Sequence, residues 1–100
     1  MRIPEFLNLG GSRYQVEVQD RVNGDDNVFG CVVFDEDKIL LKDMQGVQIM
    51  EKTFLHEMVH AIHAHMGRVD NPALDEEYVD GFANALYAVI KQNPNLFQED

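Results

Sequence analysis

Residues 50–66, MEKTFLHEMVHAIHAHM, carry the pattern that decides the fold of this 100-residue chain. Apolar side chains recur there at about every fourth position, as they do on one face of an α-helix. These positions are Met50, Phe54, Met58, Ile62 and Met66. Gly67 can supply a left-handed C-terminal cap, and Asp43 or Gln45 lies near the start. The pattern therefore predicts a first helix over about 46–66.

The middle of this helix contains His56-Glu57-Met58-Val59-His60, an H-E-x-x-H motif. Residues four apart on a helix lie one turn above each other, so the imidazoles of His56 and His60 can bind one Zn²⁺ at about 2.0–2.1 Å each. Glu57 lies beside the metal, where its carboxylate can accept a proton from metal-activated water. The motif predicts a zinc site with Glu57 as the general base.

A second helix is predicted over about 72–92. Asn71-Pro72 provides a cap followed by proline in the first turn, and Asn93-Pro94 ends the pattern. The acidic Asp75-Glu76-Glu77 suits the positive end of the helix dipole. With a turn at Gly67, this helix can return antiparallel to the first. Its inward apolar stripe is expected to be Val79, Phe82, Ala83, Leu86 and Ile90.

A catalytic zinc ion needs a third protein ligand, and the second helix offers two carboxylates for it. Stepping back along the inward stripe from Val79 and Ala83 reaches Glu76, whereas Glu77 lies toward the flank. We therefore predict Glu76 as the third ligand, with Glu77 as the alternative. Asp80, one turn beyond Glu76, can accept the free ring N–H of a liganding histidine and fix its tautomer.

Two further histidines follow the motif on the same helix. His63 rises a further turn and His65 points well round the cylinder, so neither closes the site easily. His63 either contacts a metal-ligating residue or the substrate, or is an ordinary, partly exposed histidine. His65 is expected to be exposed. The donor that stabilises the oxyanion stays open among four side chains: Tyr14, His63, His65 and Tyr78.

The first forty or so residues alternate with the period of β-strands. A hairpin is predicted from residues 6–9 and 13–19 around Gly10-Gly11. One of its faces is apolar and contains Tyr14, Val16 and Val18. Residues 20–27 have the composition of a solvated loop, and the spacing of their Asp residues does not match a calcium loop.

A second hairpin is predicted from the apolar run at residues 28–34 and from residues 38–42, separated by Asp35-Glu36-Asp37. Strands followed by helices indicate an α+β fold. We expect one α+β domain over residues 1–100. It would consist of a small antiparallel sheet of three or four strands packed on two helices that carry the metal site.

Charge and composition exclude several functions. Eighteen acidic and eight basic side chains give a net charge of -10, which repels phosphate backbones and anionic lipids. No nucleic-acid or membrane partner is therefore expected, and no run of residues approaches the ~18 apolar positions of a membrane span. The one cysteine, Cys31, cannot form an internal disulfide, and its apolar neighbours suggest a buried thiol in a reducing compartment. A cytoplasmic location is expected.

An H-E-x-x-H motif followed by a Glu four residues before an Asp is similar to the gluzincin class of zinc peptidases. The shared positions are His56, Glu57, His60, Glu76 and Asp80. Residues 53–62, TFLHEMVHAI, with residues 76–79, EEYV, and 82–86, FANAL, more narrowly resemble minimal gluzincins related to the ImmA/IrrE metallopeptidases. Many of these are encoded in phages and prophages. The resemblance implies a small zincin fold in a bacterial or phage cytoplasm. Some relatives act on a repressor protein, and such a substrate is one option.

The sequence thus predicts a zinc metalloendopeptidase acting on a peptide or protein substrate, with His56, His60 and Glu76 as metal ligands and Glu57 as the catalytic residue. Zinc is favoured over nickel or cobalt by availability and ligand type. The alternative is an acidic, zinc-stabilised and catalytically silent protein that binds a basic protein partner. A metal-free α+β domain with ordinary histidines is the third reading. The oligomeric state is left open.

Overall fold

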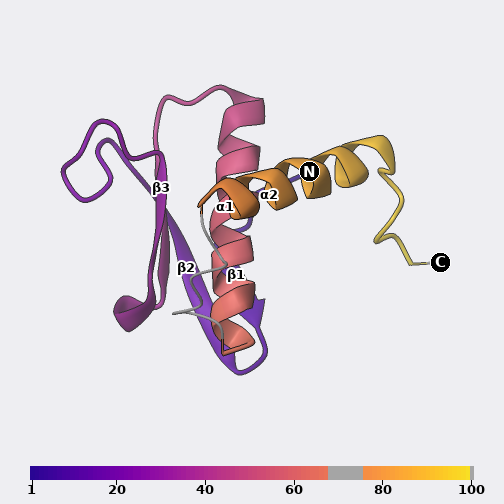
Figure 1. The fold of residues 1–100 in the computed structure, drawn as a ribbon, viewed down its shortest axis with the longest axis horizontal. Helices are drawn as coiled ribbons and strands as arrows, with labels where there is room; N and C mark the ends of the chain where they lie inside the picture. The colour runs from indigo at the N-terminus through magenta and orange to yellow at the C-terminus, as the bar shows by residue number, and fades with distance from the viewer. Residues whose placement is uncertain (68–75, 100) are drawn as a thin grey trace.

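The computed structural model describes residues 1–67 and 76–99, which form a four-stranded sheet and two α-helices (Figure 1). The elements are β1 (Phe6–Leu9), β2 (Ser12–Gln19), β3 (Gly30–Val33), a short 3-10 helix η1 (Phe34–Glu36), β4 (Lys38–Lys42), α1 (Val47–His65) and α2 (Glu76–Gln92). The predicted α+β class, both hairpins and both helices are confirmed. The predicted cap at Asn71-Pro72 and the residue Asp75 lie outside the described residues.

The prediction of a purely antiparallel sheet is wrong, because the strand order is β1-β2-β4-β3. The pairs β1-β2 and β3-β4 are antiparallel, but β2 pairs with β4 in parallel. Three consecutive residues of β4 are buried, Ile39, Leu40 and Leu41, which suits an interior strand covered on both faces. Strand directions alternate along the chain, so β2 and β4 run in the same direction. Because β4 lies between β2 and β3 in the sheet, these two parallel strands are neighbours. β3 thereby lies at the edge of the sheet.

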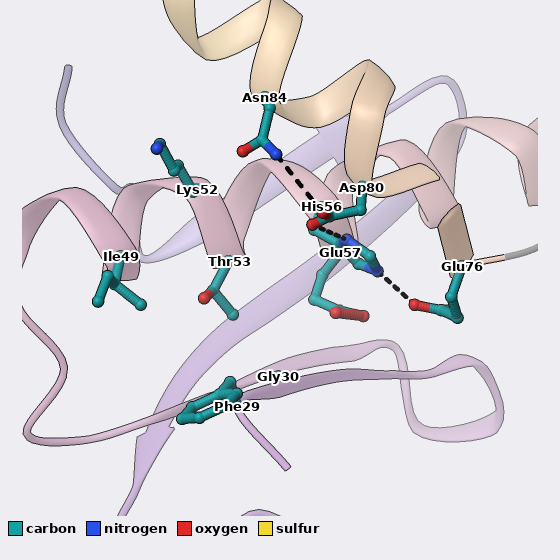
Figure 2. A pocket seen from close by; sticks show the side chains of 10 residues that line it. All are labelled: Phe29, Gly30, Ile49, Lys52, Thr53, His56, Glu57, Glu76, Asp80 and Asn84. Atoms are coloured by element: carbon teal, nitrogen blue, oxygen red, sulfur yellow. Dashed lines mark hydrogen bonds and ion pairs between the residues drawn. The ribbon is translucent and has the colours of Figure 1, made fainter. Parts of the chain in front are cut away.

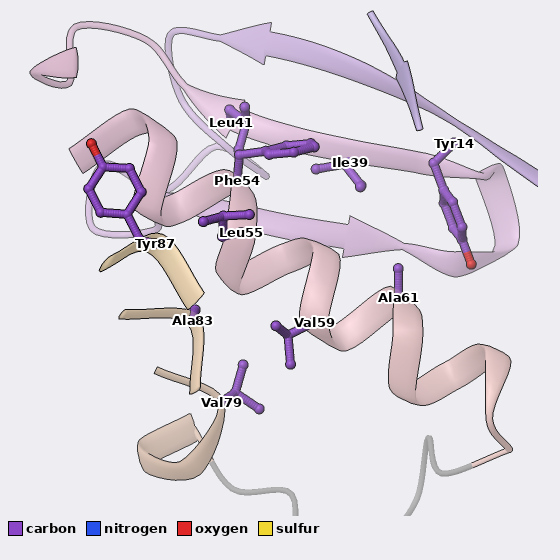
Figure 3. Close-up of a cluster of buried hydrophobic side chains, with 10 residues drawn as sticks. All are labelled: Tyr14, Ile39, Leu41, Phe54, Leu55, Val59, Ala61, Val79, Ala83 and Tyr87. Atoms are coloured by element: carbon purple, nitrogen blue, oxygen red, sulfur yellow. The ribbon is translucent and has the colours of Figure 1, made fainter. Parts of the chain in front are cut away.

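The core lies between the sheet and α1, and α2 covers the other side of α1 (Figure 3). Its buried members are Tyr14, Ile39, Leu41, Phe54, Leu55, Val59, Ala61, Val79, Ala83 and Tyr87. Leu55 and Val59 are buried beside the predicted stripe of α1, because this helix is covered by two neighbours instead of one. The helix therefore has two apolar faces, of which the four-residue spacing revealed only the first.

The two helices do not run antiparallel as predicted, since α2 crosses α1 at a steep angle (Figure 1). Val79, Ala83 and Tyr87 are the buried residues of α2. Phe82, expected on the inward stripe, is exposed, and so is Val18 on β2. α1 packs chiefly on β3 and β4. Val18, near the C-terminal end of β2, is therefore left uncovered by this helix.

Residues 20–27 form a loop, as predicted, but Val22 within it is fully buried. Asp25 Oδ1 accepts a hydrogen bond of 2.8 Å from the backbone N–H of Asn27, a turn-forming contact typical of Asp. Cys31 is partly buried, less than its apolar neighbours suggested. Among the residues described, neither helix is long and apolar enough to cross a membrane.

A buried carboxylate joins the two helices away from the motif. Tyr87 Oη donates a hydrogen bond of 2.7 Å to Glu51 Oε1, and Lys91 Nζ lies 3.8 Å from the same oxygen. The Tyr87 hydrogen bond is the main reason why the pKa of Glu51 lies below its ordinary value. This contact ties the C-terminal half of α2 to the first turns of α1.

We expect Tyr87→Phe to lower the melting temperature by a few degrees, because the buried Glu51 carboxylate loses a donor. A double-mutant cycle with Glu51→Leu, which has no acceptor, followed by thermal denaturation, measures the coupling between the two side chains. If the two substitutions are additive in their effects, the hydrogen bond does not stabilise the helix pair.

Candidate metal centre

His56 and His60 lie one turn apart in the middle of α1, with ring centroids 5.0 Å apart. Their neighbours Leu55 and Val59 are buried beneath α2. Both imidazoles therefore stand at the margin of the core, partly covered and still reachable from solvent. The helix places two nitrogen donors on one face, as the motif predicts.

Glu76, at the start of α2, approaches the imidazole of His56 (Figure 2) and also that of His60. Its Oε2 lies 2.7 Å from His56 Nε2 and its Oε1 lies 2.8 Å from His60 Nε2. Val79, one turn further along, is fully buried and anchors this end of α2. Each of the three residues offers one ligand atom, and these atoms lie within 4.8 Å of one another.

This donor set fits a divalent metal ion. Two imidazole nitrogens and one carboxylate oxygen are the ligand types that zinc accepts in catalytic sites. Ligand atoms around a tetrahedral zinc ion at 2.0–2.1 Å lie roughly 3.3 Å apart, which is longer than the two contacts of Glu76 with the imidazoles, 2.7 and 2.8 Å, and shorter than the 4.8 Å that bounds the cluster. Because the Glu76 side chain is largely exposed, its carboxylate has room to adjust around an ion.

Asp80 lies on the opposite side of the His56 ring from Glu76. Its Oδ1 is 3.6 Å from His56 Nδ1, and its Oδ2 is 3.4 Å from the amide nitrogen of Asn84, which donates to it. The distance to His56 is that of an ion-pair contact and is too long for a hydrogen bond. Asp80 therefore faces the ring nitrogen expected from the sequence, and Asn84 is an additional neighbour that the sequence did not indicate.

Glu57 is buried between α1 and β3, beside the cluster. Burial raises the pKa of its carboxyl from 4.5 to about 7, the nearby His56 opposes this rise, and the charge of Glu76 adds to it. A carboxyl with a pKa near neutrality can both accept and return a proton at the pH of most cells. Burial likewise lowers the pKa of His60, which favours the neutral imidazole that ligates metals.

Gly30, the first residue of β3, allows the strand to approach α1 beside Glu57. A Cβ atom at this position would lie 2.7 Å from Thr53 Cγ2 and 3.1 Å from Glu57 Cγ. A glycine within an apolar strand pattern, such as Gly30 in residues 28–34, is a signal of such close backbone approach. The wall opposite the motif thus depends on a residue without a side chain.

We expect Gly30→Ala to destabilise the fold by about 1–3 kcal/mol, because the added methyl group overpacks the contact between β3 and α1. Urea denaturation measures the change. Gly81→Ala is the matched control, since a Cβ there has nothing within 4 Å and alanine in a helix should instead stabilise by about 0.5–1 kcal/mol. Equal effects of both substitutions would contradict the close approach at Gly30.

The remaining candidates lie outside the cluster. His63 Nδ1 contacts the Val59 carbonyl oxygen at 2.9 Å, and the exposed His65 packs against Gly10. Tyr14 is buried in the core. Glu77 and Tyr78 line a separate hollow on α2 with Gly81 and Phe82. The structure therefore brings Glu76, and not Glu77, to the histidines.

Comparison of the chain with protein-family models, curated proteins and solved structures finds no match. The resemblance to gluzincins consequently remains a prediction based on the motif.

Proposed function

We propose that this protein is a zinc-dependent peptidase with a small zincin-like fold. The observation that carries the proposal is the convergence of His56, His60 and Glu76, with ligand atoms within 4.8 Å of one another, beside the buried carboxyl of Glu57. His56, His60 and Glu76 would hold the ion with three protein ligands, the number that catalytic zinc sites use.

When bound, zinc supplies Lewis acidity, lowering the pKa of a coordinated water toward ~7 and polarising the substrate carbonyl. Glu57 takes the proton from the attacking water at its carboxylate and returns it to the leaving amine nitrogen. Asp80, with Oδ1 at 3.6 Å from His56 Nδ1, is the carboxylate that would accept the free ring N–H and orient Nε2 toward the centre. The protein thus supplies the base and the orientation of the ligands.

An extended peptide is the substrate that the neighbouring sheet edge favours. The Phe29 carbonyl oxygen accepts a hydrogen bond from Lys42 N, so the alternating backbone groups of Gly30 and Val32 point away from β4. In the described part of the chain, no strand pairs with this side of β3. An open edge can bind an extended peptide by main-chain hydrogen bonds. Two hollows lie along it and share Gly30, Glu57 and Glu76.

The test combines metal analysis with digestion of an unfolded protein. We expect one zinc ion per chain by elemental analysis and the appearance of peptides by mass spectrometry. Chelation should stop the digestion, and added zinc should restore it. One zinc per chain without any digestion would contradict the proposal and would instead fit a catalytically silent zinc protein.

A further inference from the structure

A pocket of about 380 Å³ opens directly beside the candidate metal centre (Figure 2). His56, Glu57 and Glu76 form one end of it. The pocket then continues along α1 toward the first turns of that helix. Asp80 and Asn84 of α2 line it as well. Its volume lies in the lower part of the range of ligand-binding pockets.

Two exposed apolar side chains from different elements line this pocket. Phe29, just before β3, is 54% exposed, and Ile49, in the first turns of α1, is 56% exposed. Exposed apolar groups that gather at a hollow next to reactive residues indicate a binding surface. The pocket is therefore polar at the metal centre and apolar along part of the remaining wall.

A hydrogen-bond network holds the two sides of the pocket together. Gln45 Nε2 donates to the carbonyl oxygens of Phe29, at 3.1 Å, and of Lys42, at 2.8 Å. Thr53 Oγ1, on α1, donates to Gln45 Oε1 at 3.0 Å. The segment that carries Phe29 is thus attached to the helix that carries Ile49. A pocket arranged in advance loses less conformational entropy when it binds a ligand.

We propose that this pocket receives a large apolar side chain of the substrate, adjacent to the bond that is cleaved. The proposal rests on the proposed peptidase function. It follows from the continuity of the pocket with the metal centre and from the apolar surfaces of Phe29 and Ile49. A leucine or phenylalanine side chain would cover both surfaces and remove them from water. The pocket then determines which peptide bonds are cleaved.

A series of amino-acid hydroxamates tests the preference without any hydrolysis. The hydroxamate group chelates zinc, and the side chain beside it samples the pocket. We expect the leucine and phenylalanine hydroxamates to bind the zinc-loaded protein at least about tenfold more tightly than the alanine hydroxamate, which corresponds to about 1.4 kcal/mol. The aspartate hydroxamate should bind no better than the alanine one. Isothermal titration calorimetry measures all four, and affinities within twofold of one another would overturn the proposal.

Substitutions in the pocket test the same preference from the protein side. Phe29→Ala and Ile49→Ala should each reduce the ratio of phenylalanine to alanine hydroxamate affinity several-fold. Both side chains are largely exposed, so the fold should tolerate their removal. Val47→Ala is the matched control, because Val47 is 77% exposed in the same turn of α1 and lies outside the pocket. An unchanged ratio in both pocket variants would overturn the assignment of Phe29 and Ile49.

The two proposals fail in different ways. An apolar preference among the hydroxamates without digestion of any protein would support the pocket and contradict the peptidase function. Digestion without a preference, at cleavage sites of every composition, would support the peptidase and overturn the pocket. If zinc binds but no hydroxamate does, both are wrong.

Discussion

Glu57→Gln is expected to lower the rate of peptide hydrolysis by about 10²–10⁴-fold, the contribution typical of a general base. Glutamine keeps the size of the side chain but cannot accept the proton of the attacking water. Since His56, His60 and Glu76 are unaltered, the variant should still bind one zinc ion per chain. The measurement is the initial rate of digestion of an unfolded protein by wild type and variant at equal zinc content. Full activity of the variant would remove Glu57 from the mechanism.

The same substitution should stabilise the metal-free protein at neutral and alkaline pH. The pKa of Glu57 rises from 4.5 to about 7 on folding, mainly through burial. The folded state therefore holds a proton that the unfolded state has released, and stability falls as the pH rises from about 4.5 through 7. At pH 8 this corresponds to about 3 kcal/mol. A neutral glutamine has no such dependence, so the variant should be more stable by a similar amount.

Urea denaturation of both metal-free proteins at pH 5 and pH 8 measures this difference. Glu77→Gln is the control, because Glu77 is exposed and lies on the neighbouring surface of α2. Its effect on stability should be small and similar at both pH values. A difference between wild type and Glu57→Gln that does not grow from pH 5 to pH 8 would show that the buried carboxyl is not protonated in the folded state.

Much of this centre is predictable from the sequence because its geometry is local. His56, Glu57 and His60 belong to one helix, and helical spacing alone places them on adjacent faces. The apolar stripe of the second helix predicts Glu76 correctly as the carboxylate nearest the histidines, because Val79 and Ala83 pack in the core with α1. This prediction does not depend on the angle between the helices. Glu76 lies one turn from Val79, and it therefore stays near the contact of Val79 with α1 whatever that angle is. This is why Glu76 reaches the histidines although α2 crosses α1 steeply.

The walls around the centre were not predictable, because they depend on strand order. Alternation identifies both hairpins but does not say which strand of the second hairpin pairs with β2. The burial of β4 on both faces decides this, and it places β3 and Gly30 beside Glu57. Phe29 and Ile49 are far apart in sequence, and only the packing of β3 on α1 brings them to one pocket. Contacts between residues far apart in sequence leave no periodic pattern of side chains, so they cannot be predicted from hydrophobic spacing.

Zinc is expected to raise the free energy of unfolding by about 4 kcal/mol when its free concentration is 1,000 times the dissociation constant. The gain arises because the three donors are close together only in the folded state. Glu76→Gln should lose most of this gain, since an amide is a weaker ligand than a carboxylate. Thermal denaturation with and without zinc measures it, and His60→Ala should behave as Glu76→Gln does.

Glu77→Gln separates the two carboxylates that the sequence left open, and it should retain the full stabilisation by zinc. For Glu77 to be the ligand, α2 would have to rotate by about 100° about its own axis. Such a rotation would carry Val79 and Ala83, both fully or almost fully buried, away from α1. The packing free energy of these residues therefore opposes the exchange of ligands. If Glu77→Gln lost the stabilisation and Glu76→Gln kept it, the orientation of α2 on α1 would be wrong as well as the ligand.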